Sequence, residues 1–339
     1  MDGTGTETRD EAALGAGCLL SVVVPVYKES RNIGPFLERM LPVLQRIGSY
    51  ELLFCLDPSP DDTEAVIRRA IERDPNIGLL TFSRRFGQPA ATMAGILNCR
   101  GGHCAVIDVD LQDPPELVEE MFRHAQEGFD VVYARRRTRD GETLVKKLIA
   151  AIGYKVINTI ADVQIPRNTG DFRIISRRVI EELRHLPEGH GFLRGLVALV
   201  GFRQTFVEYD RAARFSGTGN YSRLFGSLKI GFNGLIGFSS QPLSMLLLSG
   251  SVIAGVAFLL AVAMILNKLF GDVNYPLGIP TLTVLVLFMG GVQLIAVGVL
   301  GEYIGRIYDE VRRRPMYVVD SAVNVALRDA RGPGTGAPP

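Results

Sequence analysis

The sequence predicts an α/β protein with a mostly parallel sheet and helices on both faces, followed by amphipathic interfacial helices and a transmembrane α-helical hairpin. Three observations support this prediction. Apolar, strand-like runs alternate with amphipathic stretches four times between residues 18 and 134, which is the pattern of a parallel sheet with crossover helices. Polar residues follow each apolar run, where ligands bind in such sheets. Two long uncharged runs occupy the last third of the 339-residue chain.

The first expected strand, Cys18–Val26, is a continuous apolar run, which is typical of a strand buried on both faces. Further strands are expected at Glu51–Leu56, Ile77–Phe82, Cys104–Asp108, Asp130–Ala134 and, as the last one, Gln204–Tyr209. Helices are expected at about Ile33–Ile47, in a segment ending near Arg73, and at Pro89–Asn98, Leu117–Glu127 and Ser176–Leu186. Thr143–Ile160 has apolar residues at helical spacing after a basic start, so it is either a core-packing helix or one that contacts a membrane surface.

The segment Val106–Glu116, VIDVDLQDPPE, predicts a metal site. Asp108 and Asp110 lie two residues apart at a strand end, so their side chains point to the same face. Gln112 continues this alternation, and two prolines end the strand and open a helix. Two carboxylates and an amide oxygen are ligands suited to Mg²⁺ or Mn²⁺. A loop of solvated acids is the disfavoured alternative.

The composition disfavours several classes of protein. The net charge of +1 gives no electrostatic argument for nucleic-acid binding. The four cysteines have no C-x-x-C spacing, so we expect small buried side chains in a reducing compartment. No G-x-G-x-x-G follows the first strand and no P-loop motif occurs, which disfavours a dinucleotide oxidoreductase and a P-loop enzyme.

Two uncharged runs predict the membrane hairpin. The chain has no charged residue from Ile230 to Asn267 or from Val273 to Gly301. At about 1.5 Å per residue, helices over about 242–266 and 279–301 would each cross a layer of about 30 Å. Basic residues flank the outer ends, so the positive-inside tendency predicts a multi-pass protein of the inner or plasma membrane with both termini and the catalytic part in the cytoplasm. A helical hairpin in a soluble core is the disfavoured alternative.

The expected organisation has five parts. Residues 1–17 are polar without the pattern of a signal peptide, so we expect a disordered tail. The catalytic domain is expected at 18–210, and a glycine-punctuated flap loop with an interfacial helix at 211–240. The two membrane helices fall in 241–305, and 306–339 is expected to be a cytoplasmic tail.

Several strings resemble the inverting glycosyltransferases of family 2, which have a GT-A fold, and in particular the polyprenyl- and dolichyl-phosphate glycosyltransferases. The matching strings are SVVVPVYKE (Ser21–Glu29), LDPSPDDT (Leu56–Thr63), SRRFGQPAA (Ser83–Ala91), DVDLQDPPE (Asp108–Glu116), GDFRIISRRV (Gly170–Val179), FLRGLVALVGF (Phe192–Phe202) and RFSGTGNY (Arg214–Tyr221). The string DVDLQDPPE (Asp108–Glu116) is the most specific of them. The C-terminal hairpin resembles that of members with two spans.

The resemblance implies inverting transfer of a hexose from a UDP- or GDP-sugar to a polyprenyl phosphate, with Mg²⁺ or Mn²⁺ as cofactor. The residues implied to bind the nucleotide sugar are Pro25, Tyr27, Glu29, Asp57, Ser83, Asp108, Val109, Asp110 and Gln112. Those implied to hold the metal are Asp108, Asp110 and Gln112. The candidate phosphate-binding residues are Arg136, Arg139, Arg194 and Arg214, and the candidate catalytic residues are Asp110, Asp171 and Arg194.

Alternatives remain for some of these roles. Arg194 is otherwise a structural ion-pair partner, and Asp171 is otherwise a helix cap. The family commonly has a second acid at Leu56 and Ser-Lys at Gly219-Asn220, so the nucleobase and the acceptor-phosphate contact stay open. These departures motivate the alternative of a catalytically silent membrane scaffold that binds nucleotide sugars. Transfer to another lipid acceptor is a further alternative, and a homo-oligomer is left open.

Overall fold

The computed structural model describes residues 18–137, 169–186, 193–211, 241–270, 278–312 and 314–328. The chain divides into two compact units, one with a sheet and its helices and one with two long helices. The predicted tail 1–17, the predicted helical stretch 143–160 and the predicted flap and interfacial helix at 212–240 lie outside the described residues, as do Arg139 and Arg214.

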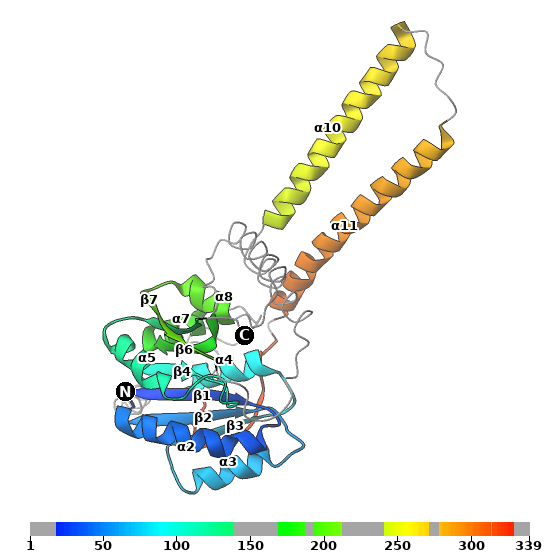
Figure 1. The fold of residues 1–339 in the computed structure, drawn as a ribbon. Coiled ribbons are helices and arrows are strands. Elements are labelled where there is room, and N and C mark those ends of the chain that lie inside the picture. Colours follow the sequence, from blue (N-terminus) through cyan, green and yellow to red (C-terminus); the bar gives the residue numbers. More distant parts are fainter. Residues whose placement is uncertain are drawn as a thin grey trace, which may run out of the picture. The chain divides into compact units, whose positions relative to one another are not determined.

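In the first unit, the described residues form an eight-stranded sheet in the order β7-β5-β6-β4-β1-β2-β3-β8 (Figure 1). The strands are β1 (Leu20–Val26), β2 (Tyr50–Leu56), β3 (Ile77–Phe82), β4 (His103–Val106), β5 (Val131–Arg136), β6 (Thr169–Ser176), β7 (Gln204–Tyr209) and β8 (Val319–Val323). Neighbouring strands are parallel except where β6 or β8 takes part. The prediction of an α/β protein with a mostly parallel sheet is therefore confirmed.

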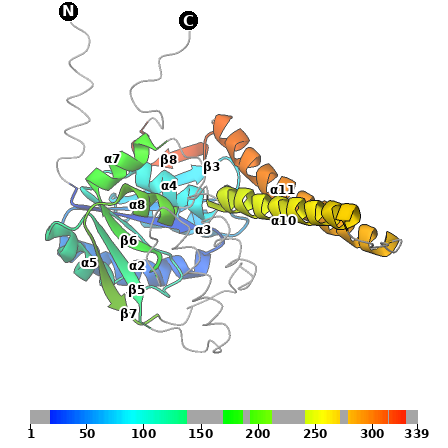
Figure 2. The ribbon, with the colours of Figure 1, turned by 90° about the horizontal axis from the view of Figure 1, so that it is seen from above.

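Helices cover both faces of this sheet, as predicted (Figures 1 and 2). One face carries α2 (Ser30–Ile47), α3 (Thr63–Ile71) and α5 (Leu117–Gln126), and the other carries α4 (Gln88–Asn98), α7 (Arg177–His185) and α8 (Leu193–Val200). In α2 the fully buried Ile33, Phe36 and Met40 recur every three or four residues, so one stripe of the helix faces the sheet.

Helix α4 lies close to the sheet because it is built from small residues. A Cβ atom on Gly95 would lie 2.3 Å from Cγ1 of Val23 on β1, so only glycine fits at this contact. The close packing fixes the height of α4 above the sheet, and with it the loop that precedes the helix.

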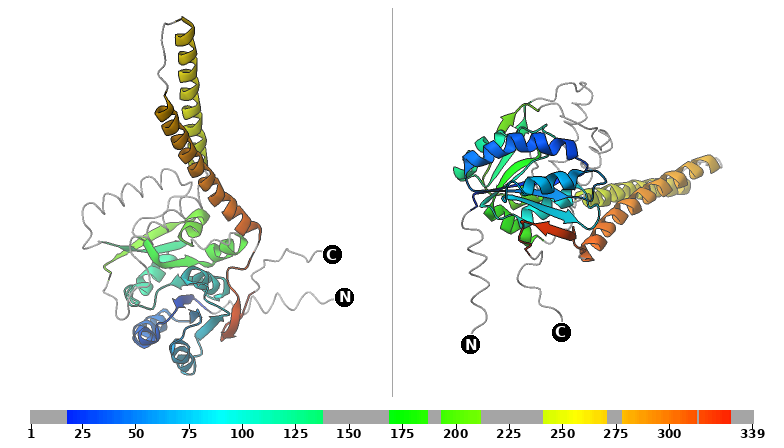
Figure 3. Two further views of the ribbon diagram at one scale, coloured as in Figure 1. Left: turned by 90° about the vertical axis from the view of Figure 1, so that its right-hand side faces the viewer. Right: turned by 90° about the horizontal axis from the view of Figure 1, so that it is seen from below.

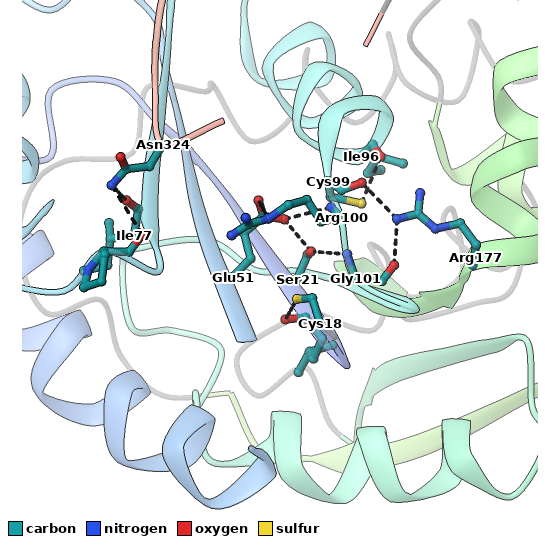
Figure 4. A network of polar contacts seen from close by, with 12 residues as sticks. Cys18, Ser21, Glu51, Ile77, Ile96, Cys99, Arg100, Gly101, Arg177 and Asn324 are labelled. Atoms are coloured by element: carbon teal, nitrogen blue, oxygen red, sulfur yellow. Dashed lines mark hydrogen bonds and ion pairs between the residues drawn. The ribbon is translucent and has the colours of Figure 1, made fainter. Parts of the chain in front are cut away.

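A buried carboxylate is fully paired at the amino ends of β1 and β2 (Figure 4). Glu51 is 0% exposed and accepts hydrogen bonds from Ser21 Oγ at 2.6 Å, from Arg100 N at 2.9 Å and from Arg100 Nε at 3.0 Å. Ser21 Oγ also accepts from Gly101 N at 2.8 Å, and Arg177 Nη2 donates to the Gly101 carbonyl at 2.8 Å. A buried charge is costly without partners, and two of the partners here, Arg100 and Gly101, belong to the turn between α4 and β4. The network therefore holds this turn against the sheet.

The described part of the second unit consists of α10 (Gln241–Phe270) and α11 (Ile279–Val311). The two helices run side by side in opposite directions (Figures 1 and 3), and the predicted spans 242–266 and 279–301 lie within them. Among the described residues, one segment, Phe288–Val311, has the length and hydropathy of a helix that crosses a membrane. Both helices expose large apolar side chains, among them Leu248, Leu259, Leu294 and Ile295. The helices are confirmed, and a membrane hairpin stays a prediction.

Two strands were not predicted. Thr169–Ser176, for which no strand was expected, forms β6 between β4 and β5. Val319–Val323 lies in the predicted tail, 306–339, but forms β8 and pairs with β3. Its five residues, VDSAV, are too few for a clear alternating pattern, and the strand is stabilised by a partner about 240 residues earlier in the chain. Gln204–Tyr209 is therefore an edge strand of the sheet but not its last strand in the sequence.

Candidate active site

The loop between β3 and α4 is tied to the end of β2. The carboxylate of Asp57, which is 3% exposed, accepts the N–H of Phe86 at 3.0 Å and the N–H of Gly87 at 2.9 Å. Gly87 has a φ of +91°, a conformation that favours glycine. Asp57, predicted to contact the nucleotide, therefore also fixes the shape of this loop.

Gln88, the residue after this loop, contacts the segment Asp108–Gln112 that is predicted to bind a metal ion (the metal string). Gln88 Nε2 donates to Asp108 Oδ1 at 2.8 Å. The buried carboxylate of Asp110 accepts the N–H of Gln112 at 3.1 Å. Between them Leu111 has a φ of +58°, a left-handed conformation that is uncommon for residues other than glycine and marks local constraint. The backbone therefore makes a constrained turn at Leu111, a few residues after the end of β4.

Asp108 lies among like charges. Burial, followed by the carboxylates of Asp171, Asp110 and Asp113, raises the pKa of Asp108 to about 8, against the opposing effect of Arg211. Asp171 is on β6 and about sixty residues away in sequence, so the fold brings it to the metal string. The site is thus rich in negative charge at one point of the sheet edge.

Two arginines pair with Asp171. Arg194 on α8 donates from Nε to Oδ1 at 2.9 Å and from Nη2 to Oδ2 at 3.3 Å. Arg173, which is 0% exposed, donates from Nη2 to Oδ1 at 3.1 Å. Burial raises the pKa of Asp171, but Arg194, Arg173 and Arg136 outweigh it and hold that pKa below its usual value. Asp171 is therefore ionised at neutral pH.

A second paired acid lies beside the metal string. Asp113, 2% exposed, accepts a hydrogen bond from the hydroxyl of Tyr209 on β7. The same hydroxyl accepts from Arg136 Nε at 3.1 Å. Arg136 Nη2 and Arg211 Nε lie 3.7 and 3.8 Å from Asp113 Oδ1. Asp113 therefore holds the guanidinium groups of Arg136 and Arg211 next to the metal string.

The end of β1 presents an aromatic ring. The guanidinium of Arg85 lies 4.0 Å from the centroid of the Tyr27 ring, and Lys28 Nζ lies 5.3 Å from it. Lys28 has a φ of +57°, so the chain turns sharply after β1. Glu29 accepts a hydrogen bond from the Asn32 side chain. A flat ring with cations around it suits a nucleotide, which carries a flat base and anionic phosphates.

Comparison with known proteins identifies the family. Residues 21–184 match the model described as glycosyl transferase family 2. An uncharacterised glycosyltransferase of Synechocystis is 42% identical over 303 residues, covering 88% of this chain and 94% of that protein. The chain belongs to glycosyltransferase family 2. The prediction that it is a glycosyltransferase is thereby confirmed.

Two further proteins are similar to this family 2 glycosyltransferase. A prophage-derived bactoprenol glucosyl transferase of Shigella flexneri is 39% identical over 303 residues, covering 88% of this chain and 97% of that protein. Among solved structures, glucosyl-3-phosphoglycerate synthase from Mycobacterium tuberculosis superposes with a TM-score of 0.44 at 19% identity, covering 70% of this chain and 84% of that one.

The donor set fits a divalent cation in this glycosyltransferase. The carboxylates of Asp108 and Asp110 and the amide of Gln112 are hard oxygen ligands, and a cation would relieve the repulsion around Asp108. Within the described ranges, no three His, Cys, Asp or Glu side chains form a metal-holding group. Two acids and an amide leave coordination positions for phosphate oxygens and water.

The structure brings many of the predicted site residues together at the sheet edge and leaves a few aside. Joined by the contacts described above are Asp57, Asp108, Asp110, Gln112, Arg136, Asp171 and Arg194. Val109 is 2% exposed, Pro25 lies inside the buried strand β1, and the amide of Ser83 donates to the carbonyl of Val318, the residue before β8. The alternative role of Asp171 as a helix cap is wrong, because Ser176 caps α7.

Three further residues contact the predicted site residues of this family 2 enzyme and were not predicted from the sequence: Gln88, Asp113 and Tyr209. Gln88 and Asp113 lie inside the strings SRRFGQPAA and DVDLQDPPE, which resemble the family. Their position in these strings was the signal that could have identified them. Tyr209 ends a predicted strand, and its place beside Asp113 depends on β7 pairing with β5. No local pattern carries that pairing.

Proposed function

We propose that this glycosyltransferase transfers a hexose, with inversion, from a UDP- or GDP-sugar to a polyprenyl phosphate, giving a lipid-linked monosaccharide for cell-envelope or glycan modification. The observation that carries the proposal is the 39% identity over nearly the whole length of a bactoprenol glucosyl transferase. Bactoprenol is a polyprenol, and its phosphate is the acceptor that this proposal assigns to the present chain.

On the donor side, Pro25, Tyr27, Glu29, Asp57, Ser83 and Val109 are proposed to line the nucleotide. Asp108, Asp110 and Gln112 are proposed to hold Mg²⁺ or Mn²⁺ together with the diphosphate. When bound, the metal supplies positive charge that stabilises the leaving nucleoside diphosphate. Gln88 orients Asp108 through its hydrogen bond, and the N–H of Gln112, after the turn at Leu111, donates to the carboxylate of Asp110.

On the acceptor side, the chain needs cationic positioning rather than a strong base. A phosphate acceptor is already anionic, so no hydroxyl proton has to be removed before it attacks the sugar. Asp171 is ionised and paired with Arg194, so its proposed task is to orient that arginine. Arg136 and Arg194, with Arg139 and Arg214 from the sequence, are proposed to bind the donor and acceptor phosphates.

The lipid acceptor requires a membrane. We propose that α10 and α11 cross the inner or plasma membrane as a hairpin, with the catalytic unit and both termini in the cytoplasm. Their exposed apolar side chains and the single described segment with the properties of a membrane span support this placement. The oligomeric state stays open in this proposal.

The test is a membrane assay with a panel of UDP- and GDP-sugars, Mn²⁺ and polyprenyl phosphate, followed by extraction of labelled lipid. We expect one sugar to appear in the lipid fraction, and we expect EDTA or Asp110→Ala to abolish it. Asp62→Ala, at an exposed helix start, is the control. Full activity in EDTA would contradict the metal's role. Sugar-nucleotide binding without any lipid product would instead favour the silent scaffold.

A further inference from the structure

The last strand of the sheet contacts the loop that leads into the donor site. β8 pairs antiparallel with β3 at one edge of the sheet (Figure 2). The ladder continues past β3, because Ser83 N donates to the Val318 carbonyl at 3.1 Å. Within the two strands, Thr81 pairs with Ser321, and their hydroxyl oxygens lie 2.6 Å apart, which fixes the register of β8 on β3. The first residue of the loop Ser83–Gly87 is thus held by the segment that follows α11.

Three aromatic rings carry this contact further into the loop. The ring of Phe82, 2% exposed, meets Tyr317 edge to face with centroids 6.0 Å apart. It meets Phe86 in the same way at 6.2 Å. Phe86 in turn lies under Arg84, whose guanidinium is 4.0 Å from the ring centroid. Tyr317 therefore supports the loop side chain Phe86 through the ring of Phe82, which contacts both.

The same segment also holds the far end of α4. Asn98 Nδ2 donates to the Tyr317 hydroxyl at 3.2 Å, and Arg328 N donates to Asn98 Oδ1 at 3.0 Å. Asn98 is the last residue of α4, and Gln88, which bonds Asp108, is the first. Residues at both ends of the loop–helix segment 83–98 are therefore bound to the chain's last described stretch.

We propose that Tyr317 and β8 are positioning elements of the donor site. They hold the loop Ser83–Gly87 in the shape in which its amides reach Asp57 and its following residue reaches Asp108. The nature of the ligand, a nucleoside diphosphate sugar, rests on the proposed function. The loop carries two adjacent exposed cations, Arg84 and Arg85, whose mutual repulsion works against a fixed shape. The contacts with Tyr317 and β8 oppose that tendency.

The first measurement needs no ligand. In the full-length protein, we expect Tyr317→Ala to accelerate amide hydrogen exchange of a peptide covering Ser83–Gln88, because the Phe86 and Gly87 amides leave Asp57 more often. Tyr317→Phe keeps the ring and should exchange at the wild-type rate there. Glu64→Ala, at an exposed position on α3 and away from β8, is the control. Unchanged exchange in Tyr317→Ala would overturn the inference.

The second measurement uses UDP-glucose with Mn²⁺ and, separately, GDP-mannose with Mn²⁺ as probes. For the probe that the wild type binds, we expect Tyr317→Ala to raise its Kd and the donor KM about three- to tenfold, the range of one or two aromatic contacts. The acceptor KM should not change. Should Tyr317→Ala not fold, Tyr317→Leu keeps apolar volume and tests the same point. Wild-type Kd and KM values in a folded variant overturn the inference, whereas a wild type that binds no sugar nucleotide and makes no product contradicts the proposed function instead.

Discussion

Arg194 and Asp171 form a two-point ion pair, with Nε 2.9 Å from Oδ1 and Nη2 3.3 Å from Oδ2. The pair joins α8 to β6 at the sheet edge where Asp108 lies. Arginine forks bind carboxylates in this way with defined geometry. An acid so held does not act as a proton acceptor near neutral pH, and this is consistent with an acceptor that brings its own negative charge.

Replacing the ionised Asp171 with a neutral residue should lower the free energy of unfolding. Asp171→Asn leaves the buried Arg173 without its carboxylate, and we expect a loss of about 1–3 kcal/mol, reduced from that of a fully buried pair by partial exposure. Since the pKa of Asp171 is lowered by folding, the stabilisation is present above the usual aspartate value of about 3.9 and is lost as pH falls through the lowered value. Thermal unfolding of both proteins between pH 7 and pH 3 measures it. A gap that already closes between pH 7 and pH 5 would argue against the ion pair.

Asp57 should control donor affinity through the loop it holds. In Asp57→Asn one oxygen remains to accept an N–H, while the amide group faces the other N–H of the Phe86–Gly87 pair. A lost hydrogen bond with a buried donor costs about 1–3 kcal/mol, so we expect the donor KM to rise at least about fivefold. Steady-state kinetics with donor varied measure this, with Asp62→Asn as the matched exposed acid. Equal donor KM values in both variants would contradict the role.

Glu51 should affect stability alone. Glu51→Gln removes the charge that Arg100 and Ser21 satisfy at the amino ends of the strands, and we expect a loss of about 3 kcal/mol in the free energy of unfolding. The donor KM should stay at the wild-type value, because the substitution is at the opposite end of the strands. Glu64→Gln breaks an exposed pair with Arg68 and should cost less than about 0.5 kcal/mol. Denaturant unfolding of the three proteins tests the contrast.

Tyr209 should matter through one hydroxyl. Burial and Asp113 raise its pKa to about 12, so it is protonated and donates to Asp113 at every working pH. Tyr209→Phe removes the link between Asp113 and Arg136, and we expect kcat/KM to fall about tenfold, or about 1.4 kcal/mol. Tyr308→Phe, at an exposed position on α11, is the control. Wild-type kinetics in Tyr209→Phe would show that Arg136 is positioned by other contacts.

The sequence was informative wherever the signal was local. The buried strands β1 to β4 are continuous apolar runs, and the string from Asp108 to Gln112 follows one of them, so both were predicted. Asp171 and Arg194 were predicted as separate site residues, but their pairing was only an alternative for Arg194, because it depends on how α8 docks on β6. Asp113 and Tyr209 are 96 residues apart, and β8 has its partner about 240 residues away. Such pairings are set by the whole sheet and not by neighbouring residues.

The position of β8 has a consequence for how the enzyme is made. β8 is translated after α10 and α11, so during synthesis the edge of β3 is open while both long helices leave the ribosome. An unpaired strand edge is a template for association with other chains. The nascent catalytic unit therefore carries an open strand edge until the last segment folds back onto β3. Under the proposed role of β8, the loop Ser83–Gly87 reaches its final shape only at that step, so the donor site is the last part of the catalytic unit to be completed.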